Sequence, residues 1–227
     1  MEEYTYIEFL IEDKSSGILV QYIMDKYVRD KKNVEYKIHS FKGIGKIPLR
    51  TDKMSKIKSR RLLTDLPMYL KGIDSYLKNM PGKKAIFVVL DSDDTDCAKL
   101  KSSLVQLYED LGIDTQVFFC IAIEEMEAWL LGDSNALLEA YPMAKRQLLQ
   151  KYAQDSIIGT WEYLADIIYP GGLQSLKKNA ASYYEIGIFK CECAKNIGVL
   201  LDIRKNASPS FNYFIRKLDS FCVSNII

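Results

Sequence analysis

Apolar and polar positions divide the chain into two parts with different periodicities. Up to residue 132, short apolar runs alternate with segments in which apolar residues recur every three or four positions. This alternation is typical of strands separated by helices, and it predicts an α/β fold with a mostly parallel sheet flanked by helices. The expected strands are Tyr4–Ile11, Val34–Phe41, Ala85–Leu90 and Thr115–Ile123, and the expected helices are Ser15–Arg29, Arg60–Leu77, Asp96–Leu111 and Glu124–Leu131.

The strand pattern ends near residue 133, and the apolar spacing beyond it is helical. Turn-forming residues in Tyr169–Gly172 and Asn206–Pro209 separate some of these helices. We therefore expect an α/β core of residues 1–132 and a helical C-terminal extension of residues 133–227 packed on it. The expected helices of the extension are Asn135–Tyr141, Ala144–Tyr152, Thr160–Ile168, Ser182–Leu201 and Ser210–Phe221.

The composition of the 227 residues narrows the class of protein. A hydrophobic fraction of 48% and a charged fraction of 27% are those of an ordinary globular protein. The longest apolar runs fall short of the roughly 20 residues that span a bilayer, and the first residues lack the pattern of a secretory signal peptide. Five scattered cysteines show no disulfide framework. These features predict a cytoplasmic protein without a membrane partner.

Acidic residues follow three of the expected strands, where the carboxyl ends of parallel strands share one edge of the sheet. Open α/β sheets build their ligand sites at that edge. Carboxylates gathered there repel one another unless a cation lies among them, and their oxygens suit Mg²⁺ or Mn²⁺. The acids are Glu12 after the first strand, Asp91 and Asp93 after the third, and Glu124 and Glu127 after the fourth.

A structural role for some of these acids stays open, because acids also stabilise the N-termini of helices. The run from Asp91 to Asp96 precedes an expected helix, and Glu124 and Glu127 open another. A spacing of three places Glu124 and Glu127 on one helix face and directs Glu125 elsewhere. His39 is the single histidine of the chain, so the sequence favours carboxylate and metal chemistry over a histidine base.

A basic segment lies between the second strand and the helix that follows it. Residues 42–61 hold eight basic residues and one acid, a local charge of +7 in a chain whose net charge is +1. The segment is either a solvated loop or a clamp for the phosphate backbone of a nucleic acid. Its basic residues are Lys42, Lys46, Arg50, Lys53, Lys56, Lys58, Arg60 and Arg61.

Two segments of the chain partly match motifs of phosphate chemistry. Asp91-Ser-Asp-Asp-Thr95 matches the D-x-D-x-T signature of haloacid-dehalogenase-type phosphatases, in which the first Asp is the nucleophile. That motif normally opens its domain, whereas about 90 residues precede it here. Gly43-Ile-Gly-Lys46 lacks the first glycine and the final Ser or Thr of a nucleotide-binding P-loop. The chain is therefore not expected to be an ATPase.

The placement of Glu12 and Asp91-Ser-Asp93 resembles the TOPRIM (topoisomerase–primase) fold, which has a Glu after its first strand and Asp-x-Asp after a later one. A closer resemblance is to an uncharacterised bacterial TOPRIM-like family, through the segments VVLDSDDTDCAKLK, IAIEEMEAWLLGD and IGVLLDIRKNASPSFNYFIRKL. Its relatives include the nuclease domains of overcoming-lysogenization-defect proteins and ATPase-associated effectors of phage defence. The usual Glu-Gly of the fold is Glu12-Asp13 here.

The resemblance implies a metal-dependent nuclease that cleaves DNA or RNA, with tRNA among the candidate substrates, and acts as an anti-phage effector with a separate ATPase. Asp91, Asp93, Glu124 and Glu127 would hold Mg²⁺ or Mn²⁺, and Glu12 would be a further ligand or an acid/base. One alternative is a catalytically silent TOPRIM module that binds an ATPase or nucleic acid. Another is the aspartate-nucleophile phosphatase. The sequence leaves the substrate and the oligomeric state open.

Overall fold

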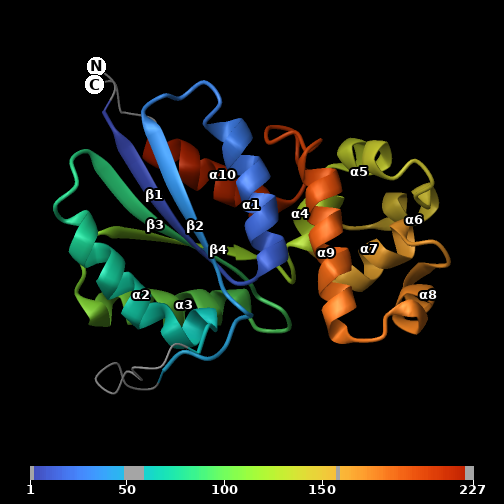
Figure 1. Ribbon diagram of the computed structural model, residues 1–227, viewed down its shortest axis with the longest axis horizontal. Coiled ribbons are helices and arrows are strands. Elements are labelled where there is room, and N and C mark those ends of the chain that lie inside the picture. Colours follow the sequence, from blue (N-terminus) through green and yellow to red (C-terminus); the bar gives the residue numbers. More distant parts are fainter. Residues whose placement is uncertain (1–2, 49–58, 157–158, 223–227) are drawn as a thin grey trace.

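The computed structural model describes residues 3–48, 59–156 and 159–222. Within them, four strands form one parallel sheet in the order β2-β1-β3-β4 (Figure 1). The α/β fold with a parallel sheet is thus confirmed. The strands are β1 (Thr5–Ile11), β2 (Val34–Ser40), β3 (Lys83–Asp91) and β4 (Gln116–Ala122).

The register brings the carboxyl ends of the strands to one edge. Ile11, the last residue of β1, pairs with Ser40 of β2 and with Val89 of β3. Asp91, the last residue of β3, pairs with Ala122 of β4. The segments that follow β1, β3 and β4 therefore begin side by side, as the sequence predicted.

Helices cover both faces of the sheet. The first face packs against α2 (Leu62–Leu77) and α3 (Cys97–Leu111), and the second packs against α1 (Lys14–Tyr27). Alternate residues of β3 point to opposite faces, so that the strand is buried on both sides and reads as a continuous apolar run. Such a run is the strongest strand signal that the sequence contains.

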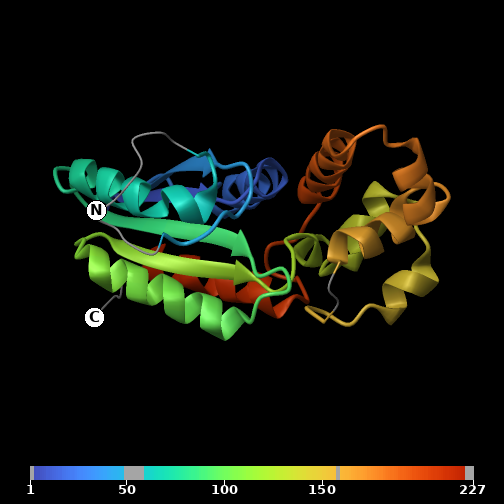
Figure 2. The same cartoon turned by 90° about the horizontal axis from the view of Figure 1, so that it is seen from below.

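The helices after residue 126 take two positions. Six helices form a lobe beyond the carboxyl edge, at the end of the molecule to which the strands point (Figure 2). The last helix, α10 (Pro209–Cys222), returns to the sheet, where Phe214 packs against Phe9 and Phe87. The helices of the lobe are α4 (Glu127–Leu131), α5 (Ser134–Ala140), α6 (Arg146–Lys151), α7 (Thr160–Ile168), α8 (Gly172–Asn179) and α9 (Tyr183–Gly198).

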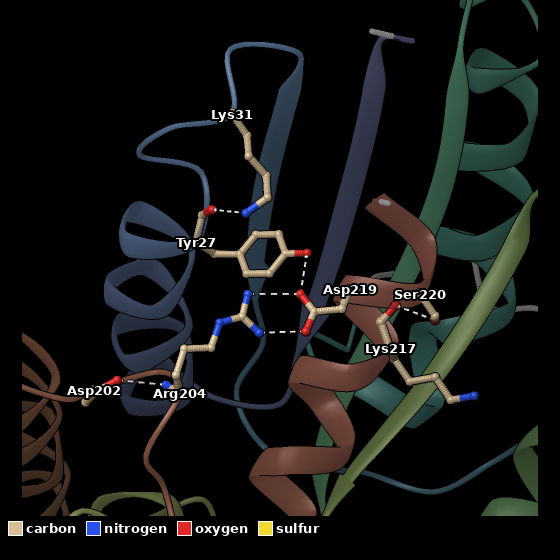
Figure 3. Close-up of polar contacts among 7 residues, drawn as sticks. All are labelled: Tyr27, Lys31, Asp202, Arg204, Lys217, Asp219 and Ser220. Carbon is tan, nitrogen blue, oxygen red and sulfur yellow. Dashed lines mark hydrogen bonds and ion pairs between the residues drawn. The ribbon is translucent and has the colours of Figure 1, made fainter. Parts of the chain in front are cut away.

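A polar cluster ties the segment between α9 and α10 to the core (Figure 3). Arg204 donates two hydrogen bonds to the carboxylate of Asp219, at 2.6 and 3.0 Å, and the hydroxyl of Tyr27 donates to the same carboxylate at 3.0 Å. Lys26 of α1 donates to the carbonyl of Gly198 at 2.9 Å. These contacts tie α10 and the segment before it to α1, and the bond to Gly198 joins the end of α9 to α1.

No helix in the described part of the chain has both the length and the apolar character that crossing a membrane requires.

Candidate functional site

Glu12 and Asp91 are joined to each other at the carboxyl edge. The Oε2 atom of Glu12 accepts a hydrogen bond of 3.0 Å from the backbone N–H of Asp91. The Oδ1 atom of Asp91 accepts one of 3.0 Å from the backbone N–H of Met126, just before α4. The structure thus brings the segments after β1, β3 and β4 together through the side chains that the sequence singled out.

Glu127 forms an ion pair with a lysine of the helical lobe. Its Oε1 atom lies 3.2 Å from Nζ of Lys190, which α9 contributes. Both side chains are largely buried, with exposed fractions of 4% for Glu127 and 16% for Lys190. The Oε2 atom of Glu127 is buried and has no hydrogen-bond partner among the described residues. One carboxylate oxygen therefore remains available for a further cation or donor.

Burial and mutual repulsion set the protonation of this cluster. Burial raises the pKa of Asp91 well above its ordinary value, Glu12 and Glu127 raise it further, and Lys190 lowers it. Burial also raises the pKa of Glu12 to about 7, although the backbone N–H of Asp91 offsets part of the rise. Burial lowers the pKa of Lys190, but Glu127 and Asp91 outweigh it, so the net shift is upward. Lys190 is thus a permanent cation among acids that resist ionising together.

Asp93 and Glu124 lie on two loops that hydrogen-bond to each other. Both have a left-handed backbone, with φ of +46° and +65°. The N–H of Asp93 donates to the carbonyl of Glu124, and the N–H of Glu124 donates to the hydroxyl of Ser92. The Glu124 side chain accepts a hydrogen bond from Thr160 of α7 at 3.0 Å, whereas Asp93 is exposed. Non-glycine residues rarely adopt this backbone, and such positions are typical of functional sites.

The expectation that Glu124 and Glu127 share one helix face is wrong, because α4 begins only at Glu127. Glu124 belongs to the preceding loop and points toward α7. Glu125, expected to point elsewhere, accepts a hydrogen bond from the N–H of Trp161, and burial together with the charge of Glu127 raises its pKa to about 7. Glu125 is therefore part of the acidic cluster.

A cleft of about 240 Å³ opens between these two loops and the lobe. Glu125 is the member of the buried cluster that lines it. Its lining residues are Asp93, Asp94, Glu124, Glu125 and Gly159.

The described ends of the basic segment lie beside Glu12. The N–H of Gly43 donates to the carbonyl of Glu12 at 2.9 Å, and the N–H of Lys42 donates to the carbonyl of Arg60 at 2.7 Å. Lys42, Lys46, Arg60 and Arg61 are all exposed. Exposed positive charge thus borders the acidic edge. The other four basic residues, Arg50, Lys53, Lys56 and Lys58, lie outside the described residues.

Three members of the cluster were not predicted from the sequence: Asp13, Glu125 and Lys190. Asp13 caps α1 by accepting a hydrogen bond of 2.7 Å from the N–H of Ser16, and its charge raises the pKa of Glu12. Lys190 lies about 180 residues from Glu12 in a helix that carries no motif. The IEEMEAW segment contains Glu125, but periodicity placed it on the wrong side of a helix that starts later than expected.

The chemistry of these side chains suits a hard divalent cation, but their present arrangement does not. Oxygen ligands are those that Mg²⁺ and Mn²⁺ prefer, and the unpaired Oε2 of Glu127 is a free donor of this kind. No three His, Cys, Asp or Glu side chains in the ranges that the structure describes are grouped closely enough to hold a metal ion as they stand. Binding would therefore require side-chain rotation at the edge.

Comparison with known proteins identifies one family. The sequence model of the family described as Domain of unknown function (DUF4276) matches residues 11–219, a span that contains every described acid of the cluster. No curated protein and no solved structure matches the chain.

Proposed function

Because the chain belongs to the DUF4276 family, whose description names no activity, we propose a function from the chemistry of its site: metal-dependent hydrolysis of nucleic-acid phosphodiesters. The observation that carries the proposal is the buried cluster of Glu12, Asp91 and Glu127 beside an exposed basic segment. Buried acids are costly unless a cation or a proton satisfies them. Exposed lysines and arginines bind phosphates.

Asp91, Asp93 and Glu127 are the residues that would hold Mg²⁺ or Mn²⁺, with Glu124 close by on the loop after β4. A bound divalent ion supplies an activated water and stabilises charge on the phosphate. Glu12, with its pKa raised to about 7, can exchange a proton near neutral pH beside the scissile bond. Lys190 offsets part of the rise that burial causes in the pKa of Glu127, and the basic segment orients the phosphate backbone.

The resemblance to TOPRIM proteins adds a biological setting to this proposal. We propose a cytoplasmic TOPRIM-type nuclease of bacterial phage defence that acts with a separate ATPase. The parallel sheet with acids after β1 and β3 supports this assignment. Substrate class and partner are set by the site and its surface rather than by the fold, so they require direct tests.

A cleavage assay tests the proposal. Wild type, Glu12→Gln and Asp91→Asn would be incubated with Mg²⁺ or Mn²⁺ and a pool of plasmid, single-stranded DNA and tRNA. We expect wild type to cleave at least one substrate and both variants to lose at least a hundredfold in rate, the order of magnitude expected when charge stabilisation in the transition state is removed. Glu109→Gln changes an exposed acid of α3 and should cleave like wild type. Equal cleavage by all four proteins would contradict the proposal.

One observation favours the silent module as the second candidate. Lys190 already gives Glu127 a counter-ion, and the acids do not converge on one point as they stand. Binding of nucleic acid without cleavage by wild type, unchanged in Glu12→Gln, would favour that alternative. The phosphatase is disfavoured because Asp91, its nucleophile, is 6% exposed and already accepts a hydrogen bond from Met126.

A further inference from the structure

One face of helix α9 is packed against α1 in its second half and exposed in its first turn. In its second half this face packs against α1: Ala194 and Gly198 are buried, and a Cβ atom on Gly198 would lie 3.1 Å from Tyr22. The first turn of α9 lies beyond the end of α1 (Figure 1), and this part of the face is exposed. Tyr183 and Tyr184 open the helix with 80% and 76% of their surfaces exposed.

The uncovered half of this face leads to the acidic edge. Residues spaced by three and four share one helix face, so Tyr183, Gly187 and Lys190 lie in line with the packed residue Ala194. A Cβ atom on Gly187 would meet no heavy atom within 4 Å, so the surface between Tyr183 and Lys190 is open. Tyr183 precedes Lys190 by about 10 Å along the helix axis. Lys190 in turn contacts Glu127.

The surroundings of the two tyrosines carry charges of both signs. Lys177 and Lys178 lie in the last turn of α8 and are exposed, and Lys177 is 3.9 Å from Glu162. On α9, the exposed Glu185 accepts a hydrogen bond from the N–H of Ala181, and Ile188 is 41% exposed. A protein-binding patch is typically a contiguous apolar area with few charges at its centre. Exposed aromatic rings with a lysine nearby are instead the arrangement by which proteins hold unpaired bases and their phosphates.

We propose that Tyr183 and Tyr184 form a stacking platform for the unpaired bases of a single-stranded nucleic acid. Lys178 contacts its phosphates, and the open surface at Gly187 lets the backbone pass to the acidic edge near Lys190. This inference rests on the proposed nuclease function and adds its substrate class. A base in a duplex has both faces stacked on its neighbours, so the platform selects single strands, loops and frayed ends.

Equilibrium binding tests the platform without relying on cleavage. The probes are fluorescein-labelled oligo(dT) and oligo(U) and a labelled DNA duplex, measured by anisotropy in the Glu12→Gln background. Replacing both tyrosines by Ala should weaken single-strand binding about tenfold for each ring, while replacing both by Phe should keep most of the affinity. The dependence of log affinity on log salt should keep its slope, because no phosphate contact is removed. Tyr76→Ala removes an exposed tyrosine of α2 and serves as the control.

The outcomes separate the platform from the nuclease. Weaker single-strand binding in the Ala variant supports the platform even if wild type cleaves nothing. Unchanged binding in the Ala variant overturns it even if wild type is an active nuclease, and so does the absence of oligonucleotide binding by the Glu12→Gln protein. A change in sedimentation of the Ala variant with unaltered oligonucleotide binding would show that these tyrosines contact protein, which also overturns the platform.

Discussion

At the scale of single residues, Lys190 has the greatest influence on the acidic edge. Burial raises the pKa of Asp91 and of Glu127, and the ammonium group of Lys190, 3.2 Å from Glu127, offsets part of the rise in both. A buried acid that loses its partner must either take up a proton or remain as an uncompensated charge. The stability of the edge therefore depends on a residue from the far end of the sequence.

We predict that Lys190→Met destabilises the protein by about 3 to 5 kcal/mol at neutral pH, because it leaves a buried carboxylate unpaired. The double variant with Glu127→Gln should recover part of this loss, since the unpaired charge is removed. Urea denaturation at pH 7.5 without divalent cations measures both. Lys195→Met, on an exposed position of the same helix, should change stability little. A double variant no more stable than Lys190→Met would contradict the pairing.

Glu12 makes the metal-free protein sensitive to pH. Its pKa is raised from 4.5 to about 7 in the folded state, so between these values the folded chain holds a proton that the unfolded chain releases. Stability contributed by this proton is present below pH 4.5 and is lost as the pH rises through 7. We predict a decrease on the order of 2 to 3 kcal/mol from pH 5 to pH 8.

Chemical denaturation in EDTA at pH 5, 6.5 and 8 checks this prediction. Residue 12 cannot ionise in Glu12→Gln, so the stability of this variant should fall less steeply with pH. The neighbouring acids with raised pKa values should cause the decrease that remains. Glu109→Gln should follow wild type. An identical pH profile for wild type and Glu12→Gln would show that burial does not shift the pKa of Glu12 in this way.

At the scale of elements, the contact between α10 and α1 depends on Asp219 (Figure 3). Burial raises its pKa, but the hydrogen bonds from Arg204 and Tyr27 outweigh this effect and lower the pKa below its ordinary value. The ionised carboxylate of Asp219 therefore stabilises the folded protein. This contribution is present above the unfolded-state pKa near 3.8 and is lost as the pH falls below it.

We predict that Arg204→Leu destabilises the protein by about 1 kcal/mol, because the pair is bidentate but partly exposed. Thermal unfolding at pH 7 measures the loss, and the difference from wild type should shrink near pH 3. Lys205→Met removes an exposed pair with Asp202 and should have a smaller effect. An equal loss in both variants would argue against a special role of the Arg204–Asp219 contact.

Most elements of the fold follow from the sequence, and the exceptions have local causes. Buried strands such as β3 appear as unbroken apolar runs, and acids at their ends locate the edge. The sequence predicts only a turn at Gly171 and Gly172, whereas both have positive φ and α8 starts at Gly172. Periodicity also extended α4 too far toward its N-terminus, which misplaced Glu124 and Glu125. Lys190 could not be predicted, because its role depends on tertiary packing.

At the scale of the whole molecule, positive and negative charges lie on adjoining surfaces although the net charge is only +1. The exposed residues Lys42 and Lys46 follow β2, and Arg60 and Arg61 precede α2. Gly43, within this segment, is bonded to the carbonyl of Glu12. A phosphate backbone that contacts the basic segment is thereby brought close to the acids.

We predict that changing Lys42, Lys46, Arg60 and Arg61 to Gln weakens binding of nucleic acid and reduces the slope of log affinity against log salt by up to about 3 to 4. The loss should be the same for unrelated sequences, because phosphate contacts carry no base preference. Titrations of labelled DNA between low and physiological salt measure the slope. A weaker affinity with an unchanged slope would mean that these residues do not contact phosphates.

The return of α10 to the sheet has a consequence for synthesis of the protein. Phe211, Phe214 and Leu218 of α10 are fully buried, and Phe214 packs on the aromatic residues of β1 and β3. A nascent chain therefore leaves the part of this sheet face that α1 does not cover exposed until α10 has been synthesised. Lys190 is also synthesised after all four strands. The ion pair between Lys190 and Glu127 therefore forms only after α9 has been synthesised, later than the strands that carry the other acids of the edge.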